Sequence, residues 1–150
     1  MLTINWSIKK FEELTILEFY SILQLREQVF VIEQECFYAD MDDKDQTCIH
    51  IMGYHNGKIV AYARIFPPQT KYEHMASYGR VLVAKSVRGT GSGKELIANI
   101  INYISKEYDT SSFKISAQFY LTKFYEEFGF TAIGKTYLDA GVEHIDMIKP

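Results

Sequence analysis

Apolar and polar residues follow two periods along this chain, and these periods predict alternating helices and strands. Over residues 91–108 the apolar positions recur every three or four residues, which is the spacing of one helix face. Over residues 113–119 every second position is apolar, which indicates a strand with one buried face. We expect another helix to begin at Thr15, because Thr15 and Glu18 have the spacing of a capping box.

Turn signals divide the rest of the chain into short elements. Asn56-Gly57 lies between two apolar stretches and predicts a β-hairpin, and Gly129 predicts the end of a short helix. In chain order the sequence predicts a strand at 2–8, a helix from 15, a loop at 35–47, strands at 49–54, 58–66 and 77–84, a helix at 91–108, a strand at 113–119, a helix at 121–128, and strands at 131–138 and 143–149. This order predicts one domain over residues 1–150 of α/β (α+β) class, with a single mixed, mostly antiparallel sheet and helices on both faces.

Composition and charge narrow the function classes. The chain has 150 residues and a net charge of −3 without a cluster of Lys and Arg, so we expect no nucleic-acid partner. Its longest unbroken apolar run, residues 59–63, is far shorter than the roughly 20 residues of a membrane-spanning helix. Residues 1–10 hold no apolar signal-peptide core, so we expect a cytoplasmic protein. Cys36 and Cys48 should then be reduced thiols, and they lack the spacing of a metal site.

The most informative segment, residues 81–94, runs from an apolar strand through a glycine-rich loop into a helix. Glycines in such a loop let an anion approach the unpaired N–H groups at the helix start, where the helix dipole also favours negative charge. The alternative is a tight turn that binds nothing. A nucleotide-binding P-loop is not matched, because Arg88 stands where that motif needs Gly and Glu95 where it needs Ser or Thr. The glycines also lack the spacing of a dinucleotide-binding fingerprint.

Two motifs resemble those of a known enzyme family. The pattern Arg88-x-x-Gly91-x-Gly93 after an apolar strand resembles the signature loop of the GNAT superfamily of N-acetyltransferases, which binds the pyrophosphate of acetyl-coenzyme A. Residues 118–130 resemble the second motif of that family, which ends in Tyr-x-x-x-Gly-Phe and here begins that ending at Tyr125. Within the superfamily the chain is most similar to the ElaA-like group. The residues that carry this similarity are Arg26, 29–34, Tyr38, Asp40, His50, 63–64, 79–81, 117–118 and 144–145.

The resemblance implies an acyl-CoA N-acyltransferase (GNAT-like) fold with acetyl-CoA as co-substrate and no metal. Residues 81–83 are then expected to splay from the neighbouring strand and to present a backbone N–H near Val83 to the thioester oxygen. The loop is expected to hold the pyrophosphate, with the Arg88 side chain either touching it or only capping the loop. The expected donor-binding residues are Val81, Leu82, Val83, Arg88, Gly89, Thr90, Gly91, Ser92, Gly93, Lys94 and Gln118.

The implied reaction moves acetyl from acetyl-CoA to a primary amine. Direct transfer in a ternary complex is expected, because neither cysteine lies in the two motifs. The resemblance makes Tyr125 the general acid toward the departing sulfur, and the alternative is that Tyr125 packs in the core. Candidates for the general base are Glu33, which follows an apolar run, and His144, whose imidazole suits neutral pH. A water chain is a third candidate, and His50 is expected to be structural.

Acidic residues crowd the segment 33–45, which has six of them and a single base, Lys44. The ordinary interpretation is a solvated loop. The resemblance places this segment beside the acceptor, where its negative charge would attract a cationic amine. An EF-hand is not matched, because the third oxygen ligand and the loop glycine are missing.

We expect the acceptor to be a small-molecule amine or a protein amine. We expect no membrane partner. The sequence is compatible with either a monomer or a homodimer. The alternative from another functional class is a non-catalytic CoA-binding sensor or interaction module with the same fold. Turnover of acetyl-CoA distinguishes the two.

Overall fold

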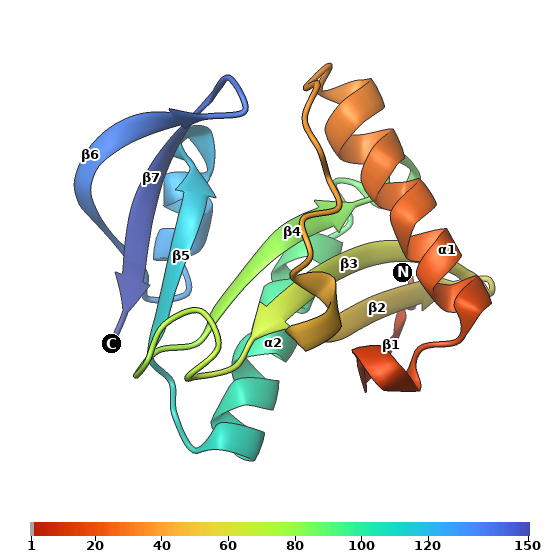
Figure 1. Ribbon diagram of the computed structural model, residues 1–150, viewed down its shortest axis with the longest axis horizontal. Helices are drawn as coiled ribbons and strands as arrows, with labels where there is room; N and C mark the ends of the chain where they lie inside the picture. The colour runs from red at the N-terminus through yellow and green to blue at the C-terminus, as the bar shows by residue number, and fades with distance from the viewer. Residues whose placement is uncertain (1) are drawn as a thin grey trace.

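The computed structural model describes residues 2–150, and every predicted helix and strand is present in the predicted order (Figure 1). The helices and strands are β1 (Asn5–Lys10), α1 (Ile16–Arg26), β2 (Ile49–His55), β3 (Lys58–Phe66), β4 (Ser77–Val83), α2 (Ser92–Tyr108), β5 (Phe113–Gln118), α3 (Thr122–Glu126), β6 (Thr131–Asp139) and β7 (Val142–Lys149). The helix α1 continues as a π-helical stretch over Glu27–Glu33. The loop that follows α1 is mostly irregular, as predicted.

The predicted fold class is confirmed, but the expected continuous sheet is divided. Strands β1, β2, β3 and β4 form one antiparallel sheet, and β5, β7 and β6 form a second. A single parallel bridge between Ala76 and Phe113 joins them. The Ala76 N–H donates to the Ser112 carbonyl at 3.0 Å, and the Lys114 N–H donates to the Ala76 carbonyl at 3.0 Å. Beyond this bridge β4 and β5 diverge (Figure 1).

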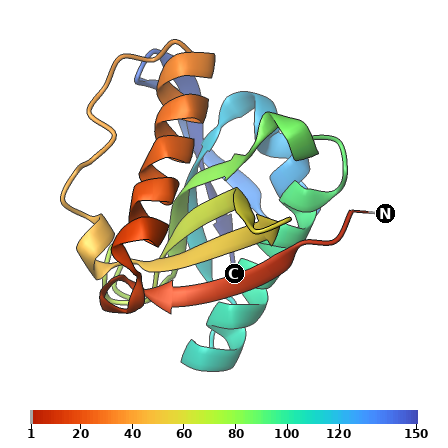
Figure 2. The same cartoon turned by 90° about the vertical axis from the view of Figure 1, so that its right-hand side faces the viewer.

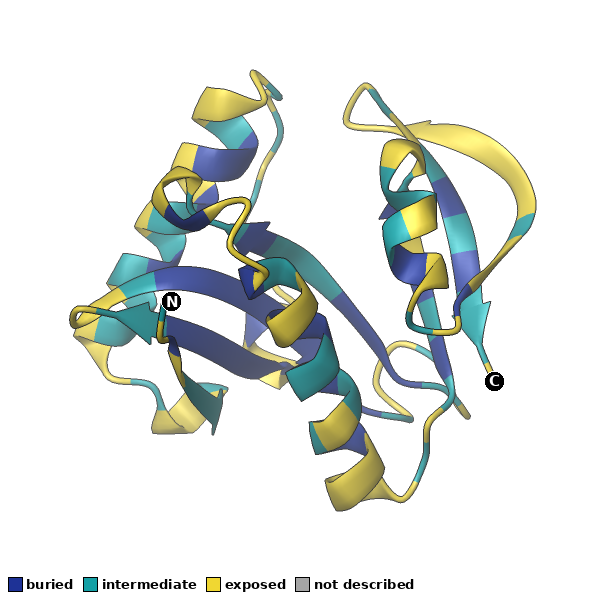
Figure 3. Cartoon of the chain, turned by 180° about the vertical axis from the view of Figure 1, so that it is seen from behind, coloured by how far each residue is buried: buried dark blue, intermediate teal, exposed yellow. Residues whose placement is uncertain are grey.

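Helices cover both faces, as the element order predicts. The view in Figure 2 places α1 on one side of the first sheet and α2 on the other. Helices α2 and α3 lie on the same side of the molecule (Figure 3). Their buried side chains share one core with the two sheets. That core contains Ile51, Ile65, Leu96, Ile97, Ile100, Ile104, Phe113, Ile115, Tyr125 and Met147. One apolar core beneath both sheets holds β4 and β5 in their diverging arrangement.

Local signals explain where the elements begin and turn. The Thr15 hydroxyl accepts from the Glu18 N–H at 3.0 Å and the Glu18 carboxylate accepts from the Thr15 N–H at 2.9 Å, so the capping box is complete. At the hairpin between β2 and β3, Asn56 and Gly57 have φ of 51° and 77°, which is the left-handed pair that a type I′ turn requires. Within residues 2–150 we find no helix that is both long and apolar enough to cross a membrane.

Candidate active site

The strand β4 has one edge that is open beyond the Ala76 bridge. The Ala84 N–H donates to the Val60 carbonyl at 2.7 Å, so Ala84 faces β3. Because successive residues of a strand face opposite sides, the N–H and C=O of Val83 face away from β3, toward the open edge. The Val83 carbonyl accepts from Arg88 Nε at 3.0 Å, which agrees with this orientation. The Val83 N–H therefore lies on this unpaired edge, which we call the opening beside β4.

A β-bulge in β4 lies just before this edge. The register between β3 and β4 shifts between Tyr62 and Arg64, and Arg80 adopts a left-handed φ of 50°. A bulge bends its strand and increases the local twist. The bend therefore turns the second half of β4 away from β5, as the family resemblance predicted for residues 81–83.

The glycine loop connects β4 to the start of α2. Gly89 and Gly91 have φ of 78° and 86°, and a Cβ on either would meet no atom within 4 Å. Gly91 is the N-cap of α2 and provides no side-chain cap, so the first N–H groups of this 17-residue helix remain available. Thr90 Oγ1 donates to the Val87 carbonyl and contacts Ser92 Oγ, both at 2.6 Å, which fixes the loop. The loop has the geometry of an anion site.

Arg88 and Glu33, which the sequence analysis assigned to different halves of the reaction, form an ion pair. Arg88 Nη2 donates to Glu33 Oε2 at 2.6 Å, while Nε holds the Val83 carbonyl. The guanidinium thus ties the end of the π-helical stretch to the glycine loop. Lys94 Nζ, at the other end of the loop, lies 3.1 Å from Glu127 Oε2.

Tyr125 projects from α3 into the shared core, where it is 5% exposed. Its ring lies 5.1 Å from the ring of Phe124, 6.0 Å from Phe130 and 6.3 Å from Tyr78. Burial raises the pKa of Tyr125 well above its usual value, so the hydroxyl keeps its hydrogen at neutral pH. The alternative of core packing is therefore confirmed for the ring, and the hydroxyl remains a neutral donor.

His144 and Gln118 lie side by side on the second sheet. The two residues are direct partners in the β5–β7 register. His144 Nδ1 lies 2.7 Å from the Val142 carbonyl, and a carbonyl only accepts, so Nδ1 carries the hydrogen. Nε2 of the neutral imidazole then holds the lone pair. This is the tautomer that a general base acting through Nε2 requires.

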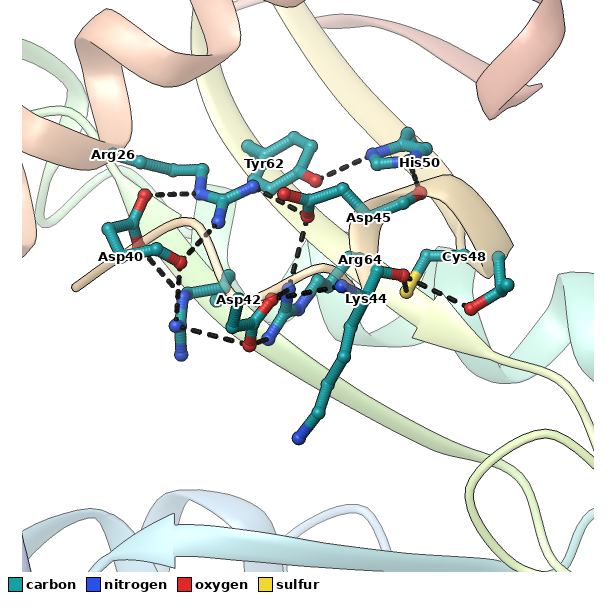
Figure 4. Close-up of polar contacts among 11 residues, drawn as sticks. Arg26, Asp40, Asp42, Lys44, Asp45, Cys48, His50, Tyr62 and Arg64 are labelled. Carbon is teal, nitrogen blue, oxygen red and sulfur yellow. Dashed lines mark hydrogen bonds and ion pairs between the residues drawn. The ribbon is translucent and has the colours of Figure 1, made fainter.

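The structure corrects the expectation that the acidic segment forms a negative wall. Asp40, Asp42 and Asp45 are paired with three guanidinium groups rather than free to attract a cation (Figure 4). We call these residues the arginine–aspartate cluster: Arg26, Asp40, Asp42, Asp45, Arg64 and Arg80. Their formal charges sum to zero. Glu33 is paired with Arg88, so most of the negative charge in the segment is locally balanced.

The cluster connects α1, the following loop, β3 and β4. Arg26 is fully buried, with Nε 2.8 Å from Asp40 Oδ2 and Nη1 2.7 Å from Asp45 Oδ1. Arg64 Nη2 lies 2.6 Å from Asp42 Oδ2. Arg80, at the bulge, places Nε 2.8 Å from Asp40 Oδ1. The bulge residue is thus held by the loop that follows α1.

His50 is structural, as expected. It is fully buried, with Nδ1 2.6 Å from the Tyr62 hydroxyl and Nε2 2.9 Å from the Asp45 carbonyl. Burial lowers the pKa of His50, so the imidazole is neutral beside the guanidinium groups of the cluster. Cys36 and Cys48 are free thiols in the structure, and burial raises the pKa of Cys48 to about 12.

A depression of about 660 Å³ lies elsewhere, between α1 and the β2–β3 hairpin. It is lined by residues such as Ser21, Gln28 and Lys58, and none of the glycine loop, Tyr125 or His144 reaches it. Residues 2–150 contain no group of three or more His, Cys, Asp or Glu that could hold a metal ion. We place the candidate active site at the opening beside β4, because the glycine loop follows this edge of the strand directly.

Comparison with known proteins decides the family. The sequence matches the model of the acetyltransferase (GNAT) domain over residues 16–150. The chain belongs to the GNAT acetyltransferase family. This GNAT protein is 44% identical over 146 residues to a UPF0039 protein of Synechocystis, with 97% of this chain and 94% of the relative covered. It is 35% identical over 148 residues to ElaA of Escherichia coli, with 97% and 96% covered.

Solved structures agree with this assignment. The crystal structure of E. coli ElaA has a TM-score of 0.91 at 35% identity, covering 99% of this chain and all of that one. An acyl-CoA N-acyltransferase from Pseudomonas aeruginosa has a TM-score of 0.93 at 32% identity, with the same coverage. The predicted GNAT fold and ElaA-like similarity are confirmed. Membership of the GNAT family supports acyl transfer from coenzyme A to an amine.

Sequence reasoning missed several polar contacts around the candidate site. Arg64 and Arg80 were noted only as part of the family pattern, and their pairing with the acidic segment was not foreseen. Tyr137, Ser116 and Asp146 were not singled out at all. The available signal was the polar half of the alternation in the predicted strands, which the search for apolar faces set aside.

Proposed function

We propose that this protein transfers acetyl from acetyl-CoA to a primary amine, directly within a ternary complex. The observation that carries the proposal is the continuity of the open edge of β4 with the uncapped start of α2. The edge offers a backbone donor at Val83, and the loop that follows offers an anion site. A thioester joined by a pantetheine arm to a pyrophosphate needs these two features in this order.

The chain has a fitting site for the donor. The pyrophosphate is assigned to residues 88–94, where Gly89 and Gly91 leave open space and the α2 dipole favours negative charge. The bound donor supplies the thioester carbonyl and the leaving thiol. The Val83 N–H would donate to the carbonyl oxygen as negative charge develops there. Arg88 would steady the loop through the Val83 carbonyl and add positive charge near the phosphates.

Tyr125 and His144 are proposed as the acid and the base. The amine nitrogen bonds to the carbonyl carbon, and the carbon–sulfur bond breaks with its electron pair on sulfur. Tyr125 gives its hydroxyl hydrogen to that sulfur, and His144 takes the amine proton on Nε2. Exchange with solvent restores both side chains. The tautomer of His144 supports it as the base, whereas the Glu33 carboxylate is engaged by Arg88.

Thiol release tests the function against its alternative. Purified protein with acetyl-CoA should release free CoA thiol when an amine from a panel of polyamines, amino sugars and peptides is added, and not without amine. Calorimetric binding of acetyl-CoA without thiol release for any amine would favour a non-catalytic CoA-binding module. Absence of acetyl-CoA binding would contradict the donor site itself.

A further inference from the structure

One face of the second sheet is polar where β5 and β7 pair. Ile115, Ala117, Ile145 and Met147 are buried in the core shared with α2 and α3. The residues between them face the other side, because successive strand residues alternate. Two directly opposed pairs lie on that side: Ser116 with Asp146, and Gln118 with His144.

A bulge in β6 adds Tyr137 to this face. Ile133 pairs with Asp146, and Tyr137 pairs with His144, so β6 advances four residues while β7 advances two. A regular ladder would have placed Lys135 opposite His144. Gly134 permits the irregularity with a φ of 73°. The bulge therefore exchanges a lysine for a tyrosine beside the imidazole.

Two hydrogen bonds hold the Tyr137 hydroxyl, and its ring stacks on the His144 imidazole. We call the hydrogen bonds from Tyr137 to Asp146 and from Ser116 to Tyr137 the clamp. The hydroxyl donates to Asp146 Oδ1 at 2.6 Å, because a carboxylate oxygen accepts. Ser116 Oγ is the second partner of the same hydroxyl, and it donates because the only hydrogen of Tyr137 is already used. The ring lies 6.1 Å from the His144 imidazole, nearly parallel at 24°. The clamp and the stack together restrict the imidazole from the β6 side.

We infer that Tyr137 is a positioning residue for the acceptor half of the reaction. Held by Ser116 and Asp146, its ring keeps the His144 imidazole in the orientation that bonds Nδ1 to the Val142 carbonyl and leaves Nε2 for the amine proton. This inference rests on the proposed function for its catalytic meaning. Tyr137 itself exchanges no proton with substrate.

The charges around the clamp suit a neutral tyrosine. Burial is the largest cause that raises the pKa of Tyr137, to about 12, and Asp146 and Asp139 also act to raise it. The hydroxyl therefore keeps its hydrogen over the working pH range. Burial lowers the pKa of the nearby Lys71, and the carboxylates of Asp146 and Asp139 act against that lowering.

The test combines kinetics with the state of the imidazole. Tyr137→Phe keeps the ring and removes the clamp, so kcat should fall about tenfold through loss of orientation. KM for acetyl-CoA should not change, because the glycine loop is untouched. Nitrogen NMR of the His144 side chain should show the Nδ1–H tautomer in the wild type and a mixture in the variant. Tyr108→Phe is the matched control, because Tyr108 is also 39% exposed and also packs against a ring, that of Tyr103.

The outcomes separate this inference from the proposed function. A Tyr137→Phe protein with the kcat of the Tyr108→Phe control and unchanged His144 signals would overturn the positioning role. A lower melting temperature with those signals unchanged would show a purely structural clamp, and would also overturn it. If the wild type transfers no acetyl group, the proposed function fails, while the His144 signals still decide whether Tyr137 sets the tautomer.

Discussion

Tyr125 has a ring packed in the shared core and a hydroxyl with a separate proposed role. Its ring completes an aromatic group with Phe124, Phe130 and Tyr78. The sequence motif predicted the residue, and helical spacing predicted that Tyr125 and Phe124 would face different directions. The sequence left core packing of Tyr125 as one of two alternatives, because its burial depends on how α3 packs against both sheets. Ring and hydroxyl can therefore be tested separately.

Tyr125→Phe keeps the packing and removes the hydroxyl. If the hydroxyl protonates the departing sulfur, kcat should fall about 10²-fold, with acetyl-CoA affinity and melting temperature unchanged. Tyr78→Phe is the control, because it removes a buried hydroxyl that has no hydrogen-bond partner from the same aromatic group. The control should keep the wild-type rate. Equal rates for both variants would leave Tyr125 as a packing residue only.

At the scale of elements, the connection from β4 to α2 was the part of the site that sequence best predicted. Glycine at 89 and 91 requires no tertiary information, because both positions have the left-handed backbone that glycine adopts freely. The ends of β4 and α2 were also predicted closely. The bulge at Arg80 was not, because a positive φ at an arginine follows from tertiary contacts rather than from its own preference.

Gly91→Ala tests whether the loop binds phosphate. A left-handed alanine costs about 1–2 kcal/mol in any loop, so a matched variant is needed to separate strain from binding. Gly57→Ala provides it, because Gly57 has a φ of 77° and no atom within 4 Å of an added Cβ, as Gly91 does. Both variants should lose similar stability. Only Gly91→Ala should weaken acetyl-CoA binding in calorimetry, by about tenfold or 1.4 kcal/mol.

Equal acetyl-CoA affinities in the Gly91 and Gly57 variants would move the phosphate site away from this loop. Weaker binding in the Gly57 variant alone would point to the hairpin side of the molecule, where the depression beside α1 lies.

Across the whole molecule, the arginine–aspartate cluster links segments that are distant in the sequence. It ties α1 and its following loop to β3 and to the bulge of β4. Element order and fold class followed from the periodicity of the sequence. The division of the sheet did not, because whether β4 pairs with β5 depends on contacts between residues that are far apart in the sequence. The partners of the acidic segment were equally hidden, since a charge run looks the same whether it is solvated or paired.

The arginine–aspartate cluster should make the free energy of unfolding depend on pH. Hydrogen bonds from Arg64 are the main cause that holds the pKa of the Asp42 carboxyl well below its usual value. A lowered pKa stabilises the folded protein above the unfolded value of about 3.9, and this contribution fades as pH falls toward the folded value. Asp42→Asn should lower the free energy of unfolding in urea by about 1–3 kcal/mol at pH 7, and the difference from wild type should shrink below about pH 4.

Asp43→Asn controls for the loss of charge in the same loop, because Asp43 is exposed and Asn tolerates its φ of 63°. It should unfold like the wild type at every pH. If the difference in free energy of unfolding between the Asp42→Asn variant and the wild type stayed constant from neutral to acid pH, Asp42 would contribute through packing rather than through its charge.

The most direct test of the account is the structure of the complex with acetyl-CoA. We predict the pyrophosphate on the N–H groups of residues 89–94, the thioester oxygen within hydrogen-bond distance of the Val83 N–H, and the sulfur within reach of the Tyr125 hydroxyl. An acetyl-CoA bound in the depression between α1 and the β2–β3 hairpin, with the opening beside β4 empty, would contradict it.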